Sequence, residues 1–116
     1  MPTNDDDAAN DDFKFATVII KPFRLEAVLD ALRPFHVDNI TVSEVRGYGR
    51  QKGHLELYRG AEYVISFIPK LRLEFVVPTA EASEIVEAVQ QSARTGRIGD
   101  GKIFLQQALI VIDEAV

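Results

Sequence analysis

The sequence contains no cysteine, which excludes disulfides and thiolate metal sites. It also lacks any apolar run near the roughly 20 residues that a membrane-spanning helix requires. The N-terminal residues include neither the basic segment nor the apolar segment of a secretory signal. We therefore expect a soluble, cytoplasmic protein.

Acidic residues are concentrated at the start of the chain. Residues 1–12 hold five aspartates and no basic side chain, and they account for the net charge of −5. Beyond them, 13 acidic side chains balance 13 lysines and arginines, because five of the 18 acidic residues belong to the first segment. A neutral body disfavours nucleic-acid binding. We expect residues 1–12 to form a disordered, solubilising tail and residues 13–116 to form a single domain.

Four segments have the composition of β-strands. Residues 70–77 alternate between apolar and mostly charged side chains, with Leu71, Leu73 and Phe75 on one side, which is typical of a strand with one buried face. β-Branched and aromatic residues favour further strands. These cover residues 13–20, 40–45 and 102–105, and the apolar run 108–112 could form a short fifth strand.

Two segments have apolar residues at helical spacing. The stripe from Leu25 to Leu32 predicts a helix that ends before Pro34. The stripe from Ala82 to Ala93 predicts a second helix, with Thr79 as its N-cap. The order β-α-β-β-α-β indicates an α+β, ferredoxin-like fold, in which two helices cover one face of an antiparallel sheet. The other face needs cover, and oligomerisation is one way to provide it.

All seven glycines fall between predicted elements, in two segments that are also basic. Residues 46–59 carry four basic side chains and one acidic, and residues 94–102 carry three and one. Glycine-rich backbone exposes N–H groups to an anion, while lysine and arginine neutralise its charge. The pattern predicts binding of a polyphosphate or another anionic metabolite, although two solvated basic turns would look the same.

The second segment, Gly96–Lys102, fits the pattern G-x-x-x-x-G-K. A true P-loop continues with serine or threonine and opens a helix. Here Ile103 follows, and a strand begins. We therefore expect phosphate-binding chemistry without the P-loop fold.

The first segment is long. Roughly two dozen residues separate the second and third predicted strands, more than the 12–15 residues that compact domains usually allow without a function or disorder. Its tyrosines and leucines indicate contact with a partner. Alternatively, residues 64–68 extend the third strand and leave a shorter hairpin, and both interpretations can hold together.

Several runs of residues resemble the PII signal-transduction family. Gly47–Tyr63 is similar to the T-loop of that family and contains the hexapeptide Tyr58-Arg-Gly-Ala-Glu-Tyr63 that is its signature. Thr95–Phe104 is similar to the B-loop, and Ile19–Phe23 also fits. The resemblance extends from Phe13 to Phe104 without an evident gap.

The resemblance implies a trimer of ferredoxin-like subunits that acts as an adaptor and not as an enzyme. Such a protein binds ATP or ADP between subunits, takes up 2-oxoglutarate with Mg²⁺, and has no tightly bound cofactor. Its T-loop docks on an ammonium channel or a nitrogen-metabolism regulatory protein, without insertion into a membrane. A uridylyltransferase modifies the T-loop in many bacterial members.

The resemblance also implies roles for individual residues. Tyr63 lies at the modified position, Tyr58 and Arg59 would contact the partner, and Gln51 would ligate Mg²⁺. The 2-oxoglutarate carboxylate would meet Lys70 and the backbone amides around Lys52 and Gly53. The remaining residues would surround the nucleotide (Thr41, Gly47, Gly49, Arg50 and Val76) or hold its phosphates (Gly99, Asp100, Gly101 and Lys102).

The resemblance fails after Phe104. Family members continue with two arginines that grip the ATP phosphates, and a gapless extension places Asp113 and Ala115 at those positions. A charge-assisted bond to phosphate contributes about 1.5–3 kcal/mol. Losing two such bonds could weaken ATP binding by roughly two to four decades. Lys102, Arg50 and Arg97 could still suffice for ADP or a smaller anion, so we predict an altered nucleotide preference with the T-loop role retained.

Two other functions stay open. Asp100 and Lys102 could support slow nucleotide hydrolysis, but no nucleophile–base pair stands beside them in the sequence. His36 and His54 are more typical of structural or solvated side chains. Alternatively, the chain is a divergent PII-like interaction module with weakened or lost nucleotide binding, and its partner binding ignores ATP, ADP and 2-oxoglutarate.

Overall fold

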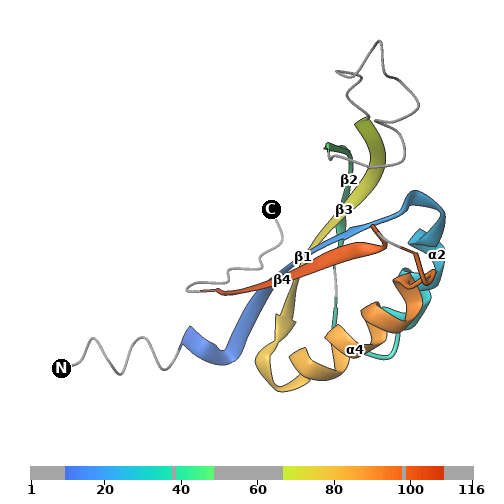
Figure 1. Cartoon of the computed structure of the whole chain (residues 1–116). Coiled ribbons are helices and arrows are strands. Elements are labelled where there is room, and N and C mark those ends of the chain that lie inside the picture. The colour runs from blue at the N-terminus through green and yellow to red at the C-terminus, as the bar shows by residue number, and fades with distance from the viewer. Residues whose placement is uncertain (1–9, 38, 49–66, 98, 109–116) are drawn as a thin grey trace, which may run out of the picture.

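Alternating apolar residues place one face of a four-stranded sheet against two helices. The computed structural model describes residues 10–37, 39–48, 67–97 and 99–108. Figure 1 shows the two helices on the same side of the sheet. The strands lie in the order β2-β3-β1-β4, and each neighbouring pair is antiparallel, which confirms the predicted ferredoxin-like fold. Their bounds are Phe13–Ile20 (β1), Thr41–Tyr48 (β2), Phe67–Pro78 (β3) and Gly101–Gln107 (β4).

The core lies between the two central strands and the helices. Ala16, Val18 and Ile20 of β1 are each 1% exposed, and Phe75, opposite Ala16 on β3, is 3% exposed. Directly opposite Val18 lies Leu73, which is fully enclosed. Ile85 packs on this layer from the helical side. Every second side chain of these strands therefore packs against the apolar face of the helices, as the sequences predict.

Both helices begin after a short 3-10 turn that starts at a proline or directly after one. Helix α2 spans Leu25–Leu32 after the turn η2 (Pro22–Arg24), and α4 spans Ala82–Ala93 after η4 (Thr79–Glu81). Proline has no N–H for the strand ladder and has a fixed φ near the helical value, so it ends one element and starts the next. The predicted bounds of both helices are confirmed. None of the helices among the described residues is long and apolar enough to cross a membrane.

The prediction that Thr79 caps the second helix is wrong. Thr79 opens η4 instead, and its hydroxyl donates a hydrogen bond to the carbonyl oxygen of Asp11 at 2.6 Å. The N-cap position belongs to Glu81, which makes no capping bond. Its carboxylate accepts a bond from the N–H of His36 at 3.1 Å and lies 2.6 Å from His36 Nδ1. These contacts lower the pKa of Glu81, the His36 backbone N–H most, and tie the chain after α2 to the start of α4.

The end of the acidic segment has regular structure. Asn10–Asp12, which the sequence placed in a disordered tail, form the 3-10 turn η1. Lys14 Nζ lies 2.7 Å from Asp11 Oδ1, and the Thr79 hydroxyl reaches the Asp11 carbonyl. Two contacts to Asp11 therefore hold this turn against the body of the domain.

Three strands are longer than predicted. β2 and β3 continue to pair with each other beyond β1, because Ile20 at the end of β1 lies opposite Leu71, whereas the last β2–β3 pair is Tyr48 with Phe67. The connection between these strands is therefore residues 49–66 and not two dozen residues. β4 begins at Gly101 and ends at Gln107. The possible fifth strand, 108–112, lies outside the described residues apart from Ala108, which is not in a strand.

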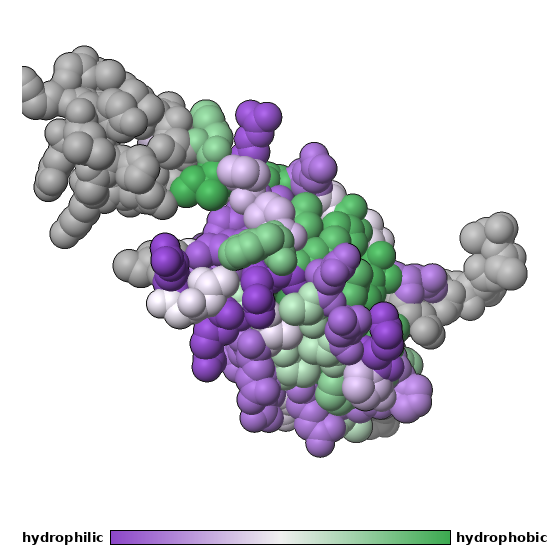
Figure 2. Space-filling model, turned by 90° about the vertical axis from the view of Figure 1, so that its right-hand side faces the viewer, coloured by the Kyte–Doolittle hydropathy of each residue, from purple (hydrophilic) through white to green (hydrophobic). Residues whose placement is uncertain are grey.

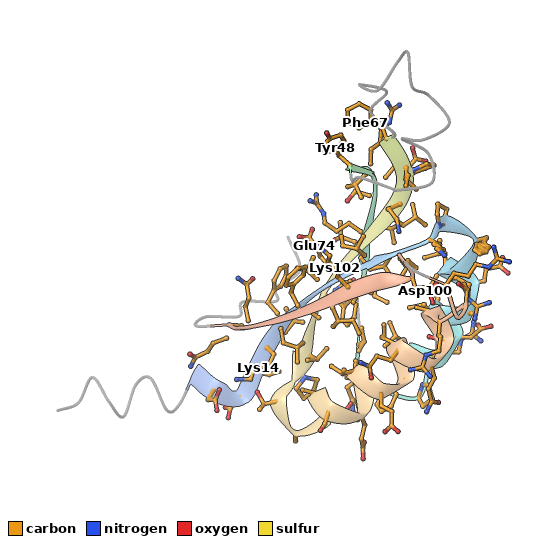
Figure 3. The ribbon with its side chains drawn as sticks, in the orientation of Figure 1. Lys14, Tyr48, Phe67, Glu74, Asp100 and Lys102 are labelled. Carbon is orange, nitrogen blue, oxygen red and sulfur yellow. The ribbon has the colours of Figure 1, made fainter. Side chains whose placement is uncertain are left out.

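The β2–β3 extension is a two-stranded ribbon that projects from the sheet. Tyr48 and Phe67 lie side by side at its tip, as Figure 3 shows, with ring centroids 5.9 Å apart. Cross-strand aromatic pairs of this kind stabilise two-stranded ribbons. The pair therefore sets the geometry from which residues 49–66 depart.

The face of the sheet that points away from the helices is partly apolar. Phe15, Ile19 and Val76 alternate with the buried core positions, and Phe104 on the same face is 51% exposed. Figure 2 shows hydrophobic residues gathered toward the upper, sheet side of the molecule, above a largely hydrophilic helical side. Among the charged residues of this face, Arg72 Nε is buried without a hydrogen-bond acceptor in the described part of the chain. We call this surface the open face.

Candidate functional site

The two glycine-containing segments meet at one end of the sheet. Gly47 lies near the end of β2, and the turn 95–101 joins α4 to β4. The side chain of Lys70 spans the space between them, because Lys70 Nζ donates a hydrogen bond to the Gly99 carbonyl oxygen. A β-carbon added at Gly47 would lie 3.7 Å from Lys70 Cγ. One lysine of β3 therefore contacts both segments that the sequence singled out.

The carboxylate of Asp100 organises the turn 95–101. It accepts hydrogen bonds from the backbone N–H groups of Thr95 at 2.7 Å and Gly96 at 3.0 Å, and from the Thr95 hydroxyl. Lys21 Nζ, at the end of β1, lies 3.0 Å from Asp100 Oδ1 and 3.3 Å from Thr95 Oγ1. The Thr95 hydroxyl and N–H, followed by Lys21 and Gly96, hold the pKa of Asp100 far below its usual range. Asp100 is thus an ionised brace of the turn.

Glycine is required where the turn passes close to β1. A β-carbon at Gly101 would lie 2.2 Å from the carbonyl oxygen of Ile19, far inside van der Waals contact. Gly96 and Gly99 both have φ of +84°, a conformation that side chains with a β-carbon rarely adopt. A β-carbon added at the first of these would have no atom within 4 Å, so its constraint is conformational alone.

Cations surround the turn on both sides. Lys21 is neutralised by Asp100, whereas the ammonium group of Lys70 donates to a neutral carbonyl oxygen of the turn. Partial burial, and then repulsion by Lys21, lower the pKa of Lys70, and Asp100 opposes this effect. Lys102 and Arg97 are exposed and form no ion pair with the described residues. An ordered glycine turn with lysines on both sides can bind an anion through N–H groups and charge.

Two predicted nucleotide residues lie elsewhere on the open face. Thr41 pairs with Glu74, and Val76 pairs with Phe15. Thr41 is six residues from Gly47 on β2, and Val76 is six residues from Lys70 on β3, so at about 3.3 Å per residue both lie roughly 20 Å along the strands from the end where the glycine segments meet. Within one chain, therefore, Gly47, Lys70 and the turn residues come together, whereas Thr41 and Val76 form a separate group.

Other predicted site residues lie outside the described residues. They are Gly49, Arg50, Gln51, Lys52, Gly53, Tyr58, Arg59 and Tyr63 of the predicted T-loop, and Asp113 and Ala115 near the C-terminus. Their predicted roles therefore stay predictions.

Three supporting residues received no role from the sequence. Lys21 and Thr95 complete the Asp100 network, and Arg24 donates from Nε, at 2.9 Å, and from Nη2 to the carbonyl oxygen of Ser92 near the end of α4. Thr95 and Gly96, followed four residues later by Asp100, form a local pattern typical of a turn in which side chains hydrogen-bond to the backbone. Lys21 and Arg24 act across long sequence separations, so only the fold brings them to these contacts.

Comparisons with known proteins identify the family. The family model described as "Nitrogen regulatory protein P-II" matches residues 13–112. The chain is 54% identical to a nitrogen regulatory protein P-II of Rhodospirillum rubrum over 98 residues, which is 84% of each chain. It is 50% identical to the nitrogen regulatory protein GlnK of Escherichia coli K12, over 85% of this chain and 88% of that one. The chain belongs to the P-II family.

A solved P-II structure has the same architecture. The PII protein of Arabidopsis thaliana, in a crystal structure bound to citrate, is 31% identical and superimposes with a TM-score of 0.65. The match covers 84% of this chain and 78% of that one. The resemblance drawn from the two glycine-containing segments is therefore confirmed, and P-II membership supports a role in signal transduction linked to nitrogen regulation.

Replacing Gly101 with alanine tests the close approach to β1. We expect Gly101→Ala to lower the free energy of unfolding by about 1–3 kcal/mol, because the new methyl group overpacks against the Ile19 carbonyl. Gly96→Ala is the matched control: its open surroundings leave only the left-handed backbone penalty of about 1–2 kcal/mol. Urea unfolding of both variants gives the comparison. Equal stability of Gly101→Ala and the unmodified protein would contradict the packing described.

The low pKa of Asp100 predicts a pH dependence. Because this pKa lies below its ordinary value of 3.8, the ionised carboxylate stabilises the folded state above that pH, and the contribution is lost as the pH falls below it. Asp100→Asn should therefore lower the Tm at pH 7 and flatten its fall between about pH 4 and 2. Asp30→Asn, which removes an exposed carboxylate on α2, is the control. Parallel Tm–pH curves for Asp100→Asn and the unmodified protein would rule out the brace.

Proposed function

We propose that this P-II protein is an adaptor that senses ATP and ADP, together with 2-oxoglutarate, and signals to nitrogen-related targets through residues 49–66. One observation carries the proposal. The turn 95–101 is closed by Asp100, and beside it lie Lys70 and Lys102, which form no ion pair with the part of the chain that the structure describes. The phosphate-binding pattern therefore lies on an ordered turn next to the base of the predicted T-loop.

The order of the turn favours a phosphate ligand. Asp100 already binds the N–H groups of Thr95 and Gly96, so the glycines and Lys102 at the far end of the turn are the groups left for a ligand. An N–H group held in place loses little conformational entropy when the anion binds. Lys102 directly follows Gly101, the first residue of β4, which brings its charge close to these N–H groups.

A homotrimer would complete the site. The residues predicted to surround the nucleotide fall into two groups roughly 20 Å apart along the strands. A second copy packed at the edge of the open face would bring Thr41 and Val76 of one chain toward the turn 95–101 of another. The apolar side chains of this face favour such a cover, as does Arg72 Nε, which has no hydrogen-bond acceptor among the described residues and lies 3.9 Å from Glu74 Oε1.

Lys70 is the group that suits 2-oxoglutarate. Its ammonium now contacts a neutral carbonyl oxygen, and a carboxylate would replace that contact with a charge-assisted bond. The PII protein of Arabidopsis thaliana was crystallised with citrate, which is also a carboxylate. Gln51 would hold the Mg²⁺, with the backbone around Lys52 and Gly53 completing this subsite.

The β2–β3 ribbon links the site to the proposed docking segment. Lys70 and Gly47 lie in this ribbon, and residues 49–66 begin at its tip. A ligand that changes the contacts of Lys70 therefore acts on β3 itself, three residues after Phe67, which directly follows the proposed docking segment. An ammonium channel or a nitrogen-metabolism regulatory protein is the proposed target, with contact through Tyr58 and Arg59 and modification of Tyr63 by a uridylyltransferase.

A weakened site is the second candidate. Asp113 and Ala115 stand where the resemblance implies phosphate-binding arginines, which favours reduced ATP affinity or an interaction module without a ligand. Hydrolysis has less support. Thr95 and Asp100 form a hydroxyl–carboxylate pair, but the low pKa of Asp100 makes its carboxylate a poor base.

Calorimetric titration with ATP and ADP, with and without Mg²⁺ and 2-oxoglutarate, tests the proposal. Lys102→Ala should weaken nucleotide binding by about one to two decades, the equivalent of one charge-assisted bond. Lys70→Ala should remove the effect of 2-oxoglutarate while nucleotide binding persists. Arg33→Ala, on the exposed side of α2, is the control.

The outcomes separate the candidates. Saturable nucleotide binding that is weakened by Lys102→Ala supports the sensor. A dissociation constant for ATP below the micromolar range would show that tight binding does not need the missing arginines. No binding of either nucleotide would overturn the sensing proposal and leave the interaction module. Sustained release of phosphate would favour the hydrolase.

A further inference from the structure

Two lysines stand opposite each other at the end of the β1–β3 pair. β1 ends with Ile20 opposite Leu71, and the antiparallel register places Lys21 and Lys70 at the next position. Like charges directly opposite on neighbouring strands repel each other. Lys21 Nζ lies 3.0 Å from Asp100 Oδ1, whereas Lys70 forms no ion pair with the part of the chain that the structure describes. The repulsion therefore favours loss of a proton from Lys70.

The other charged groups around Lys70 offset little of this repulsion. Among the described residues, Asp100 faces it from the turn 95–101, but its carboxylate is already bonded to Lys21 and to the backbone of the turn. Arg72 and Lys102 lie on the open face with Lys70, because both are opposite the same residue of β1. Cations thus outnumber acidic groups around this amine.

Burial acts in the same direction. Lys70 is partly buried, and the positions beside it on β2 are the uncharged Val45 and Gly47. Burial, followed by repulsion from Lys21, lowers the pKa of Lys70, and Asp100 opposes this shift. A desolvated lysine, or one next to a second cation, is the kind that enzymes use as a nucleophile. The surroundings therefore favour an amine that can react as well as bind.

The amine also lies within hydrogen-bond distance of the turn 95–101. Lys70 Nζ donates to the Gly99 carbonyl oxygen, and a β-carbon added at Gly99 would lie 3.7 Å from the same nitrogen. The N–H groups of this turn, together with Lys102, are the groups proposed above to hold a phosphate. A substituent bonded to that phosphate would lie beside the amine. In an acyl phosphate, this substituent is an electrophilic acyl group.

We propose that Lys70 is a modification site, acylated by an acyl phosphate whose phosphate group occupies the turn 95–101. The neutral amine attacks the acyl carbon, so that a C–N bond forms and the C–O bond to the phosphate breaks. Phosphate leaves with the bonding electron pair, and the proton lost by the nitrogen passes to solvent. The proposal rests on phosphate binding by the turn, and it needs neither a nucleotide nor 2-oxoglutarate.

Acylation changes what the site can bind. The amide nitrogen has no charge, although it keeps one N–H for the Gly99 carbonyl oxygen. A carboxylate ligand would then lose its charge-assisted bond to Lys70, whereas Lys102 would still contact a phosphate. The modification would therefore remove the proposed response to 2-oxoglutarate and leave phosphate binding by the turn in place.

Acetyl phosphate is the probe, used with the whole chain and read by peptide mass spectrometry. Lys14 is the internal control. Figure 3 shows it at the end of the sheet away from Asp100, and its ammonium lies 2.7 Å from an Asp11 carboxylate oxygen. We expect Lys70 to be acetylated about tenfold faster than Lys14 at pH 7. The rate should saturate with acetyl phosphate, and inorganic phosphate should compete, because the turn holds the reagent before it reacts.

Variants separate the contribution of the amine from that of the turn. Lys21→Gln removes the opposing cation and should move the midpoint of the pH–rate profile of Lys70 to higher pH, because the ammonium form is then less destabilised. Lys14→Gln, the matched control, should leave this profile unchanged. The N-hydroxysuccinimide ester of acetic acid carries no phosphate and should acetylate Lys70 preferentially but without saturation. Lys102→Ala should slow only the reaction with acetyl phosphate.

Saturable acetylation that favours Lys70, with a pH–rate profile that Lys21→Gln moves to higher pH, supports the proposal. Equal acetylation of Lys70 and Lys14 would overturn it, as would a rate that rises linearly with acetyl phosphate or is unchanged in Lys102→Ala. Calorimetry with ATP distinguishes this inference from the proposed sensing. Nucleotide binding without selective acetylation overturns this inference alone, and selective acetylation without nucleotide binding overturns the sensor alone. Far-UV circular dichroism confirms that each variant keeps its fold.

Discussion

The carboxylate of Asp100 is the contact on which the site depends. Four groups converge on it: two backbone N–H groups, the Thr95 hydroxyl and the Lys21 ammonium. Their combined donation keeps the group ionised and fixes the turn between α4 and β4. An acidic residue in a phosphate-binding sequence looks unfavourable, but here its charge is neutralised inside the turn. The other lysines therefore keep their charge for a ligand.

Lys70 extends the candidate site beyond the turn 95–101 to the end of β2. Its side chain runs past Gly47 and donates to Gly99, so a single residue joins the end of β2 to the turn 95–101. Partial burial and the nearby Lys21 lower the pKa of Lys70, which means that its charge is only partly balanced. A carboxylate or phosphate would relieve this imbalance. In the proposed mechanism, ligand binding would be coupled to the conformation of the β2–β3 ribbon through this ammonium group.

The sequence predicted the elements well where periodicity controls them and poorly where distant contacts do. Both helices and β1 end where expected, because proline and apolar spacing act locally. The length of β2 and β3 depends on their mutual pairing, which no local pattern reveals. Thr79 looked like a helix cap, but the nearby Asp11 carbonyl takes its hydroxyl. The glycines and basic residues of the sequence were enough to predict the turn 95–101, whereas the contact of Lys21 with this turn could be identified only from the folded structure.

The most direct test of the central claim is the response of individual backbone amides to ATP, followed by ¹H–¹⁵N NMR. The account predicts that the signals of Gly99, Gly101 and Lys102 shift saturably and that Gly47 shifts with the same dissociation constant, because Lys70 connects them. In Asp100→Asn the same shifts should need a higher ATP concentration. Saturable shifts elsewhere, with the turn 95–101 unaffected, would contradict the claim that this turn binds the phosphates.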